Sequence, residues 1–172
     1  GNSLFKKIKQ SLGELEIIAE DLGFLTPEVY QLLEDTGYPG MKILQFGFDP
    51  NADSEYLPHN YSPNSIAYTG THDNKTLKDW LASITEEEKE FCFAYANINN
   101  EEEAVNKLIK CVLASPSETV IIPLVDYLEL GEEARFNIPS TLGNNWVWRM
   151  DESDLTEELQ ERILKNTKTY KR

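Results

Sequence analysis

Short apolar runs, each followed by a cluster of polar residues, alternate along this chain with helix-like patterns, and this alternation limits the folds open to it. The runs are LEIIA at 15–19, MKILQF at 41–46, SIAYT at 65–69 and ETVIIPLV at 118–125. Parallel neighbouring strands need a crossover connection, which is usually a helix. The pattern therefore predicts an α/β fold with four parallel strands, which is half of an eight-stranded barrel.

The helices are predicted from apolar residues at helical spacing, together with start and stop signals. Two capping boxes, at Thr85 with Glu88 and at Asn100 with Glu103, begin a pair of helices near the last strand. This pair is predicted to be an inserted helical hairpin. The predicted helices cover residues 3–12, 27–36, 86–97, 101–114 and 155–170.

The charge of the chain excludes several classes of partner. Sixteen Lys and Arg residues against 30 Asp and Glu residues give a net charge of −14, so phosphate backbones and anionic membrane surfaces repel it. No apolar stretch approaches the roughly 20 residues of a bilayer-spanning helix. Cys92 and Cys111 fall in helical patterns without metal-ligand spacing, which indicates buried thiols. We expect one cytoplasmic domain that binds neither nucleic acid nor membrane.

Polar side chains follow each predicted strand, where the loops of a parallel βα fold carry reactive groups. Carboxylates accept hydrogen bonds from sugar hydroxyls, and glycosyl chemistry needs two carboxyl groups across one bond. Because the chain gathers several carboxylates with aromatic residues nearby, it is predicted to act on a neutral carbohydrate. The residues that follow the four runs are Glu20 and Asp21, then Asp49, then His72, Asp73 and Asn74, and finally Asp126 and Tyr127.

Each of these signals has a structural alternative. An acidic pair such as Glu20 and Asp21 can cap a helix or fix a loop. Turn chemistry explains Asn74 but not His72, which favours a functional role for the histidine. Trp146 and Trp148 have the spacing of one strand face, which favours packing over a sugar platform. The acidic groups are scattered rather than set at ligand spacing, so we expect no metal site.

Five blocks of the chain, in order, resemble the C-terminal part of the 4-alpha-glucanotransferase (amylomaltase, or disproportionating enzyme) family, which belongs to the alpha-amylase clan. The likeness runs from about residue 4 to about residue 170, and the order of the blocks makes it specific. The blocks are IIAEDLGFLTPEV at 17–29, GYPGMKILQFGFD at 37–49, LPHNY at 57–61, YTGTHDNKT at 68–76 and ARFNIPSTLGNNWVWR at 134–149.

This resemblance implies an activity and a set of roles. The family transfers segments of alpha-1,4-glucan between maltooligosaccharides, with retention and without a metal or organic cofactor. Glu20 in the AEDLG block matches the general acid/base, and Asp73 in the THDN block matches the carboxylate that stabilises the transition state. The four predicted strands then correspond to strands five to eight of a TIM barrel. Substrate contacts are expected at His72, Asp49, Asp21 and Asn74.

One part of the family's pattern has no counterpart. The nucleophilic aspartate of the family lies in a segment of the form Arg, hydrophobic residue, Asp, His, and these 172 residues contain none. Asp21 cannot replace it, because a retaining enzyme holds its two carboxyl groups roughly 5–5.5 Å apart on opposing sides of the bond. We therefore expect residues 1–172 to be a single partial barrel domain, truncated on its N-terminal side and inactive alone.

A partial barrel leads to one further expectation about assembly, and one functional alternative stays open. Exposed parallel edges and apolar strand faces seek partners, so we expect self-association. A second functional hypothesis is a non-catalytic module on the same framework, which binds glucans or another partner without turnover.

Overall fold

A computed structural model describes residues 1–172 of this protein, and three short parallel strands form its sheet. The strands β1 (Gly40–Ile43), β2 (Ser65–Tyr68) and β3 (Thr119–Ile121) lie in the order β1-β2-β3. Ile43 is level with Tyr68, which is level with Ile121. Helices connect β2 to β3, so the predicted α/β class with a parallel sheet is confirmed.

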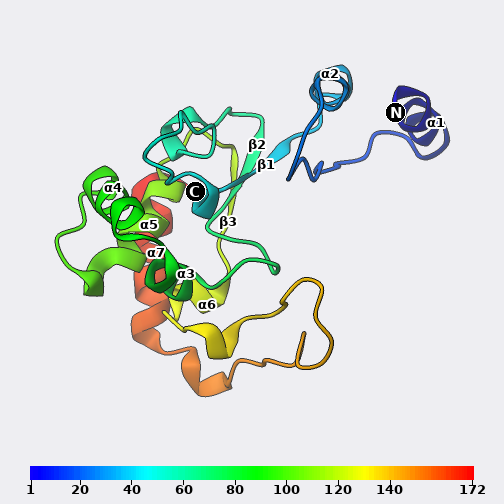
Figure 1. Ribbon diagram of the computed structural model, residues 1–172. Helices are drawn as coiled ribbons and strands as arrows, with labels where there is room; N and C mark the ends of the chain where they lie inside the picture. Colours follow the sequence, from blue (N-terminus) through cyan, green and yellow to red (C-terminus); the bar gives the residue numbers. More distant parts are fainter.

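Seven α-helices accompany the sheet (Figure 1). All five predicted helices are present, with ends that differ by at most a few residues. The prediction missed two others, α3 and the short α6. The helices are α1 (Asn2–Leu12), α2 (Pro27–Thr36), α3 (Leu77–Ser83), α4 (Glu86–Ala96), α5 (Glu101–Leu113), α6 (Leu124–Tyr127) and α7 (Glu157–Tyr170).

Local side-chain chemistry explains where the two hairpin helices begin. The Thr85 N–H donates to the Glu88 carboxylate at 2.8 Å, and the Glu88 N–H donates to the Thr85 hydroxyl at 3.3 Å, which completes a capping box before α4. Asn100 accepts from the Glu103 N–H at 3.2 Å before α5, but the Glu103 carboxylate binds the Asn99 N–H instead. The helical hairpin is thus confirmed, with one full and one partial capping box.

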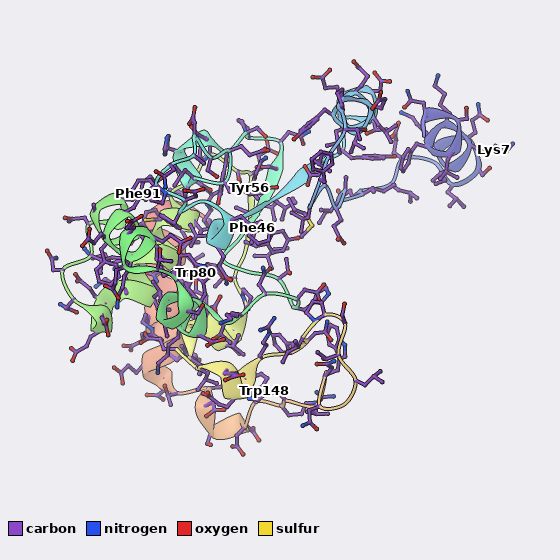
Figure 2. The ribbon with its side chains drawn as sticks, viewed as in Figure 1. Lys7, Phe46, Tyr56, Trp80, Phe91 and Trp148 are labelled. Atoms are coloured by element: carbon purple, nitrogen blue, oxygen red, sulfur yellow. The ribbon has the colours of Figure 1, made fainter.

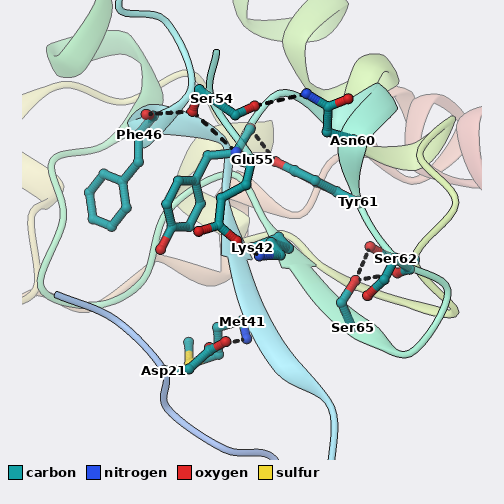
Figure 3. A network of polar contacts seen from close by, with 12 residues as sticks. Asp21, Met41, Lys42, Phe46, Ser54, Glu55, Asn60, Tyr61, Ser62 and Ser65 are labelled. Atoms are coloured by element: carbon teal, nitrogen blue, oxygen red, sulfur yellow. Dashed lines mark hydrogen bonds and ion pairs between the residues drawn. The ribbon is translucent and has the colours of Figure 1, made fainter. Parts of the chain in front are cut away.

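The first predicted strand, at 15–19, is wrong. The Ala19 N–H donates to the Pro39 carbonyl at 2.9 Å, and in a parallel pair the Ala19 carbonyl would accept in return from the Met41 N–H, two residues after Pro39. The Met41 N–H donates instead to the Asp21 side chain at 2.6 Å (Figure 3). Because a carboxylate takes the place of a strand carbonyl, this segment stays irregular and the sheet has three strands, not four.

The other strand predictions are too long at their carboxyl ends. After β1 the chain turns into a 3-10 helix over Leu44–Phe46, and β3 stops at Ile121. Pro123 cannot donate to a strand ladder and instead precedes α6. Asp126 and Tyr127 therefore lie in a buried helix, not in a loop at a strand end.

The apolar core lies between the sheet and the helices α4, α5 and α7, and its 18 residues all fall between Leu44 and Leu159. Helix α5 contributes the most, because Leu108, Ile109 and Val112 are almost completely buried. Aromatic side chains extend the core on one side, where the Phe48 ring lies 5.7 Å from that of Trp80. Figure 2 shows Trp80 and Phe91 in this region.

Residues 1–38 form an N-terminal arm outside this core. Neither α1 nor α2 contains a buried residue, and Figure 1 shows both helices apart from the rest of the molecule. Phe5 packs edge-on against Tyr38, with ring centroids 5.3 Å apart. Hydrogen bonds link the arm to the rest of the molecule at Asp21 and Ala19, beside the start of β1, and at the Gly37 carbonyl, which accepts from the Asn64 amide at 3.1 Å.

The two cysteines are free thiols, and the prediction that both are buried holds for Cys92 only. Cys92 is buried and Cys111 is half-buried, and burial raises the pKa of Cys92 to about 12. Neither thiol is therefore activated as a nucleophile. No helix has the length and apolar character that crossing a membrane requires.

Candidate functional site

A cleft of about 550 Å³ opens at the carboxyl ends of the strands. Met41, Tyr68 and Ile121, one from each strand, line its apolar side. Glu20, His72, Asp73 and Asn74 line it as well, together with the ring of Phe46, which is 45% exposed. The structure therefore brings four of the six predicted site residues together in one cleft.

The loop that carries His72 and Asp73, residues 69–77, is fixed at both ends by one buried carboxylate. Asp126, which is only 2% exposed, accepts from the Thr69 hydroxyl at 2.5 Å and from the Leu77 N–H at 2.7 Å. The Gln45 amide also donates to the Lys75 carbonyl at 2.9 Å. Asp126 cannot touch a substrate, but it fixes both ends of the 69–77 loop.

Asn74 shapes the same loop from within. Its Oδ1 accepts from both the N–H and the hydroxyl of Thr71, each at 2.8 Å. The Thr71 hydroxyl lies in turn 3.3 Å from the Asp73 N–H, which donates to it. The Asn74 oxygen is thus engaged inside the loop.

His72 and Asp73 lie side by side at the open side of the cleft. Nε2 of His72 is 3.5 Å from Oδ1 of Asp73, and the two side chains are 55% and 49% exposed. The His72 ring also lies against the Trp146 ring, with centroids 5.1 Å apart and planes at 41°. Both side chains are accessible to a ligand.

The expectation that Trp146 and Trp148 share one strand face is wrong. Their segment forms no strand, and Trp146 has a φ of +65°, which is a left-handed backbone conformation that strand residues do not adopt. Trp146 is 54% exposed beside His72, whereas Trp148 packs edge-on against Phe136 at 5.7 Å. Only Trp148 has the packing role expected of both.

Asp21 and Asp49 do not line the cleft. Asp21 is buried, and its carboxylate lies so close to Gly40 that a larger side chain at position 40 would collide with it. Asp49 is exposed and binds the Asn51 N–H at 2.9 Å, which closes a turn. In this structure both aspartates make backbone contacts.

Sequence reasoning missed two residues beside Asp73. The Asn137 amide donates to Oδ1 of Asp73 at 2.6 Å, and the Arg135 guanidinium donates to the Asp73 carbonyl at 3.0 Å. Both residues fall in the block ARFNIPSTLGNNWVWR, but nothing local in that block indicates which loop it contacts. No group of three or more His, Cys, Asp or Glu side chains is arranged to hold a metal ion.

Comparison with known proteins gives consistent matches over the chain. A family model described as 4-alpha-glucanotransferase matches residues 1–156. The 4-alpha-glucanotransferase of Streptococcus pneumoniae serotype 4 is 48% identical over 173 residues, which covers 100% of this chain and 34% of that protein. The 4-alpha-glucanotransferase of Clostridium butyricum is 46% identical over 170 residues, covering 98% of this chain and 35% of that protein.

Solved structures agree with these matches. Amylomaltase from Streptococcus agalactiae in complex with acarbose superposes with a TM-score of 0.95 at 40% identity, over 99% of this chain and 35% of that one. Amylomaltase from Corynebacterium glutamicum, at 24% identity and a TM-score of 0.64, covers 90% of this chain and 29% of that one, and shows the shared fold alone. The chain spans about a third of the length of these two curated relatives.

Proposed function

Because the chain belongs to the 4-alpha-glucanotransferase family, we propose that its cleft is part of a site that transfers segments of alpha-1,4-glucans between maltooligosaccharides. The supporting observation is that Glu20, His72 and Asp73, from two separate segments, line the same cleft. The 40% identical amylomaltase of Streptococcus agalactiae is in complex with acarbose, a carbohydrate, which favours a sugar ligand here too.

The proposed mechanism is a retaining double displacement. Glu20 protonates the glycosidic oxygen while an aspartate of the intact enzyme attacks the anomeric carbon, so the glycosidic bond breaks and a glycosyl-enzyme bond forms. Glu20 then removes the proton from an acceptor hydroxyl, which displaces the aspartate. Asp73 binds sugar hydroxyls and stabilises the positive charge that develops on the ring, and His72 contacts the same sugar.

Substrate contacts by Asp21, Asp49 and Asn74 stay predictions. The Asp21 and Asn74 side chains each have an oxygen bound to a donor inside the protein, and Asp49 lies outside the cleft. His72 has more than half of its side chain exposed in the cleft. Of the four residues expected to contact substrate, His72 is therefore the one whose present position suits that role best.

We propose that residues 1–172 form a single domain equivalent to the C-terminal half of the family's TIM barrel. In this arrangement the nucleophile would be supplied by a part of the barrel that these 172 residues do not contain. The cytoplasmic location also stays a prediction, since one 41% identical relative is the chloroplastic/amyloplastic enzyme of Arabidopsis thaliana.

The isolated chain is expected to bind acarbose weakly and to carry out no transfer. Incubation of the purified chain with maltotriose should release no glucose and form no longer dextrins, because proton donation without a nucleophile cannot give a glycosyl-enzyme. Release of glucose together with longer dextrins would contradict this. Acarbose should shift the NMR signals of residues that line the cleft.

A matched pair of variants separates the two functional hypotheses. In a divided catalytic site, Glu20→Gln should weaken acarbose binding, because the carboxyl group lies in the cleft. Glu16→Gln, which changes an exposed acid outside the cleft, is the control. Glucan binding that Glu20→Gln leaves unchanged would favour a non-catalytic module instead.

Self-association through the free edge of β3 is a second expected result. The sheet order leaves β1 and β3 as outer strands, and the β1 edge is partly occupied by Asp21. Thr119 of β3 is exposed and lines a groove of about 370 Å³ together with Val120, so a second copy can pair there. Sedimentation velocity should show a larger species as the protein concentration rises.

A lysine placed on this edge should oppose the pairing. Thr119→Lys is expected to restore the monomer, whereas Gln10→Lys, which adds the same charge on α1, should not. A compact monomer of the unmodified chain at high concentration would contradict the proposal.

A further inference from the structure

Two hydrogen bonds join the 69–77 loop to the segment that follows the 3-10 helix Glu132–Ala134, and a third braces that segment internally. Arg135 donates through Nη2 to the Asp73 carbonyl and through Nε to the Asn137 carbonyl, both at 3.0 Å. The Arg135 side chain therefore links the backbone at Asp73 to the backbone at Asn137. The Asn137 Nδ2 then donates to Oδ1 of Asp73 at 2.6 Å.

These contacts occupy one side of the Asp73 carboxylate. Oδ1 takes both the hydrogen bond from Asn137 and the contact with His72 at 3.5 Å. Oδ2 has no protein partner, and Asp73 lines the cleft. A half-exposed aspartate without such a donor would sample several rotamers, whereas a charge-assisted hydrogen bond favours one.

We propose that Asn137 is a positioning residue for Asp73, which holds the carboxylate in the rotamer that presents its free oxygen to a bound sugar. This inference rests on the proposed function, because it takes Asp73 as the carboxylate that binds the sugar. Asn137 itself does not line the cleft and acts only through Asp73.

The test compares two substitutions that change the donor differently. Asn137→Ala removes the hydrogen bond, and Asn137→Asp keeps the shape but places a second carboxylate against Asp73. Three-bond NMR couplings of the Asp73 side chain should indicate one rotamer in the unmodified chain and an average in both variants. Acarbose should bind about fivefold more weakly to Asn137→Ala and at least about tenfold more weakly to Asn137→Asp.

The order of the two variants distinguishes positioning from packing, because a packing role would make the isosteric Asp the milder change. Asn64→Ala is the control, since the Asn64 amide also donates a hydrogen bond across the fold, to the Gly37 carbonyl at 3.1 Å, and Asn64 does not line the cleft. Asp73 couplings that stay unchanged in both variants would overturn the inference, as would averaged couplings with unchanged acarbose affinity.

The two readouts also keep the two proposals apart. An unmodified chain that shows no acarbose binding at any concentration counts against the proposed function of this chain. The Asp73 couplings are measured without ligand, so in that case they alone decide the inference. A single Asp73 rotamer that persists in Asn137→Asp overturns it, and averaging in that variant supports it.

Discussion

Replacing Asp126 with alanine is expected to lower the free energy of unfolding by about 3 kcal/mol, because it leaves two donors without an acceptor. The Thr69 hydroxyl and the Leu77 N–H both donate to this carboxylate, and it is 2% exposed, so water cannot easily replace it. The same change releases both ends of the 69–77 loop, which carries Asp73. Urea denaturation measures the loss, and amide hydrogen exchange of residues 69–77 should accelerate.

Asparagine at this position is expected to behave differently. Its carbonyl oxygen can accept from Leu77 while its amide donates to the Thr69 hydroxyl, so both contacts survive without a buried charge. Burial raises the pKa of Asp126 above its ordinary value of 3.8, although the hydrogen bonds from Thr69 and Leu77 oppose this shift. An ionised Asp126 is therefore a cost that Asp126→Asn removes.

The direction of the pKa shift fixes how this difference depends on pH. A carboxyl group whose pKa is raised by folding contributes stability that is complete below its unfolded value and is lost as the pH rises through the folded value. Asp126→Asn has no such dependence at this position. Its stability relative to the unmodified protein should therefore be greatest near about pH 8 and should decrease toward about pH 4.

Asp53→Asn is the control for Asp126→Asn, because Asp53 is exposed and makes no side-chain hydrogen bond. It should change the free energy of unfolding by no more than about 0.5 kcal/mol at any of these pH values. An Asp126→Asn variant as unstable as Asp126→Ala would show that the charge, rather than the two hydrogen bonds, holds the loop. An Asp126→Ala variant of normal stability would contradict the whole argument.

The parts of this fold that were predictable from sequence are those fixed by neighbours in the chain. Pro27 and Gly37 mark the ends of α2 because each acts on its own backbone, and Thr85 begins α4 through a residue three positions away. The position of the 69–77 loop at a strand end is predictable for the same reason. It follows β2 directly, and its polar residues indicated a site.

The errors arise where a distant residue decides. Residues 15–19 have the composition of a strand, but the Asp21 side chain binds the β1 donor that a strand would need. The sequence predicts that Asp126 is an accessible carboxylate at a strand end, because nothing near it in sequence shows that Thr69 and Leu77 bind it in the interior. Contacts across tens of residues leave no periodic signal in a single sequence.

The same limit applies to the candidate site. The sequence placed Glu20 and Asp73 after separate strands, and the structure puts both on one cleft. It gave no indication that Asn137 would meet Asp73, since the two residues belong to different loops. Asp73 could be located from pattern because it follows β2, and Glu20 lines the cleft although no strand precedes it, whereas a donor such as Asn137 comes from wherever the fold places it.

Truncation of Leu108 to alanine is expected to cost about 4 kcal/mol of unfolding free energy, through lost burial and the cavity that remains. Leu108 is 0% exposed in the middle of α5, which contacts α4, α6 and α7. Leu164→Ala, on α7 with 51% of the leucine exposed, is the control and should cost no more than about 0.5 kcal/mol. Equal losses in the two variants, measured by urea denaturation, would contradict this description of the core.

This substitution also tests whether the N-terminal arm is energetically separate from the rest. Because α6 contacts α5 and carries Asp126, a weakened core should raise the hydrogen exchange rates of α5 and of the 69–77 loop together. Helices α1 and α2 bury no residue, so their amides should already exchange through local opening and should not respond. Faster exchange in α1, in step with α5, would show instead that the arm depends on the core for its stability.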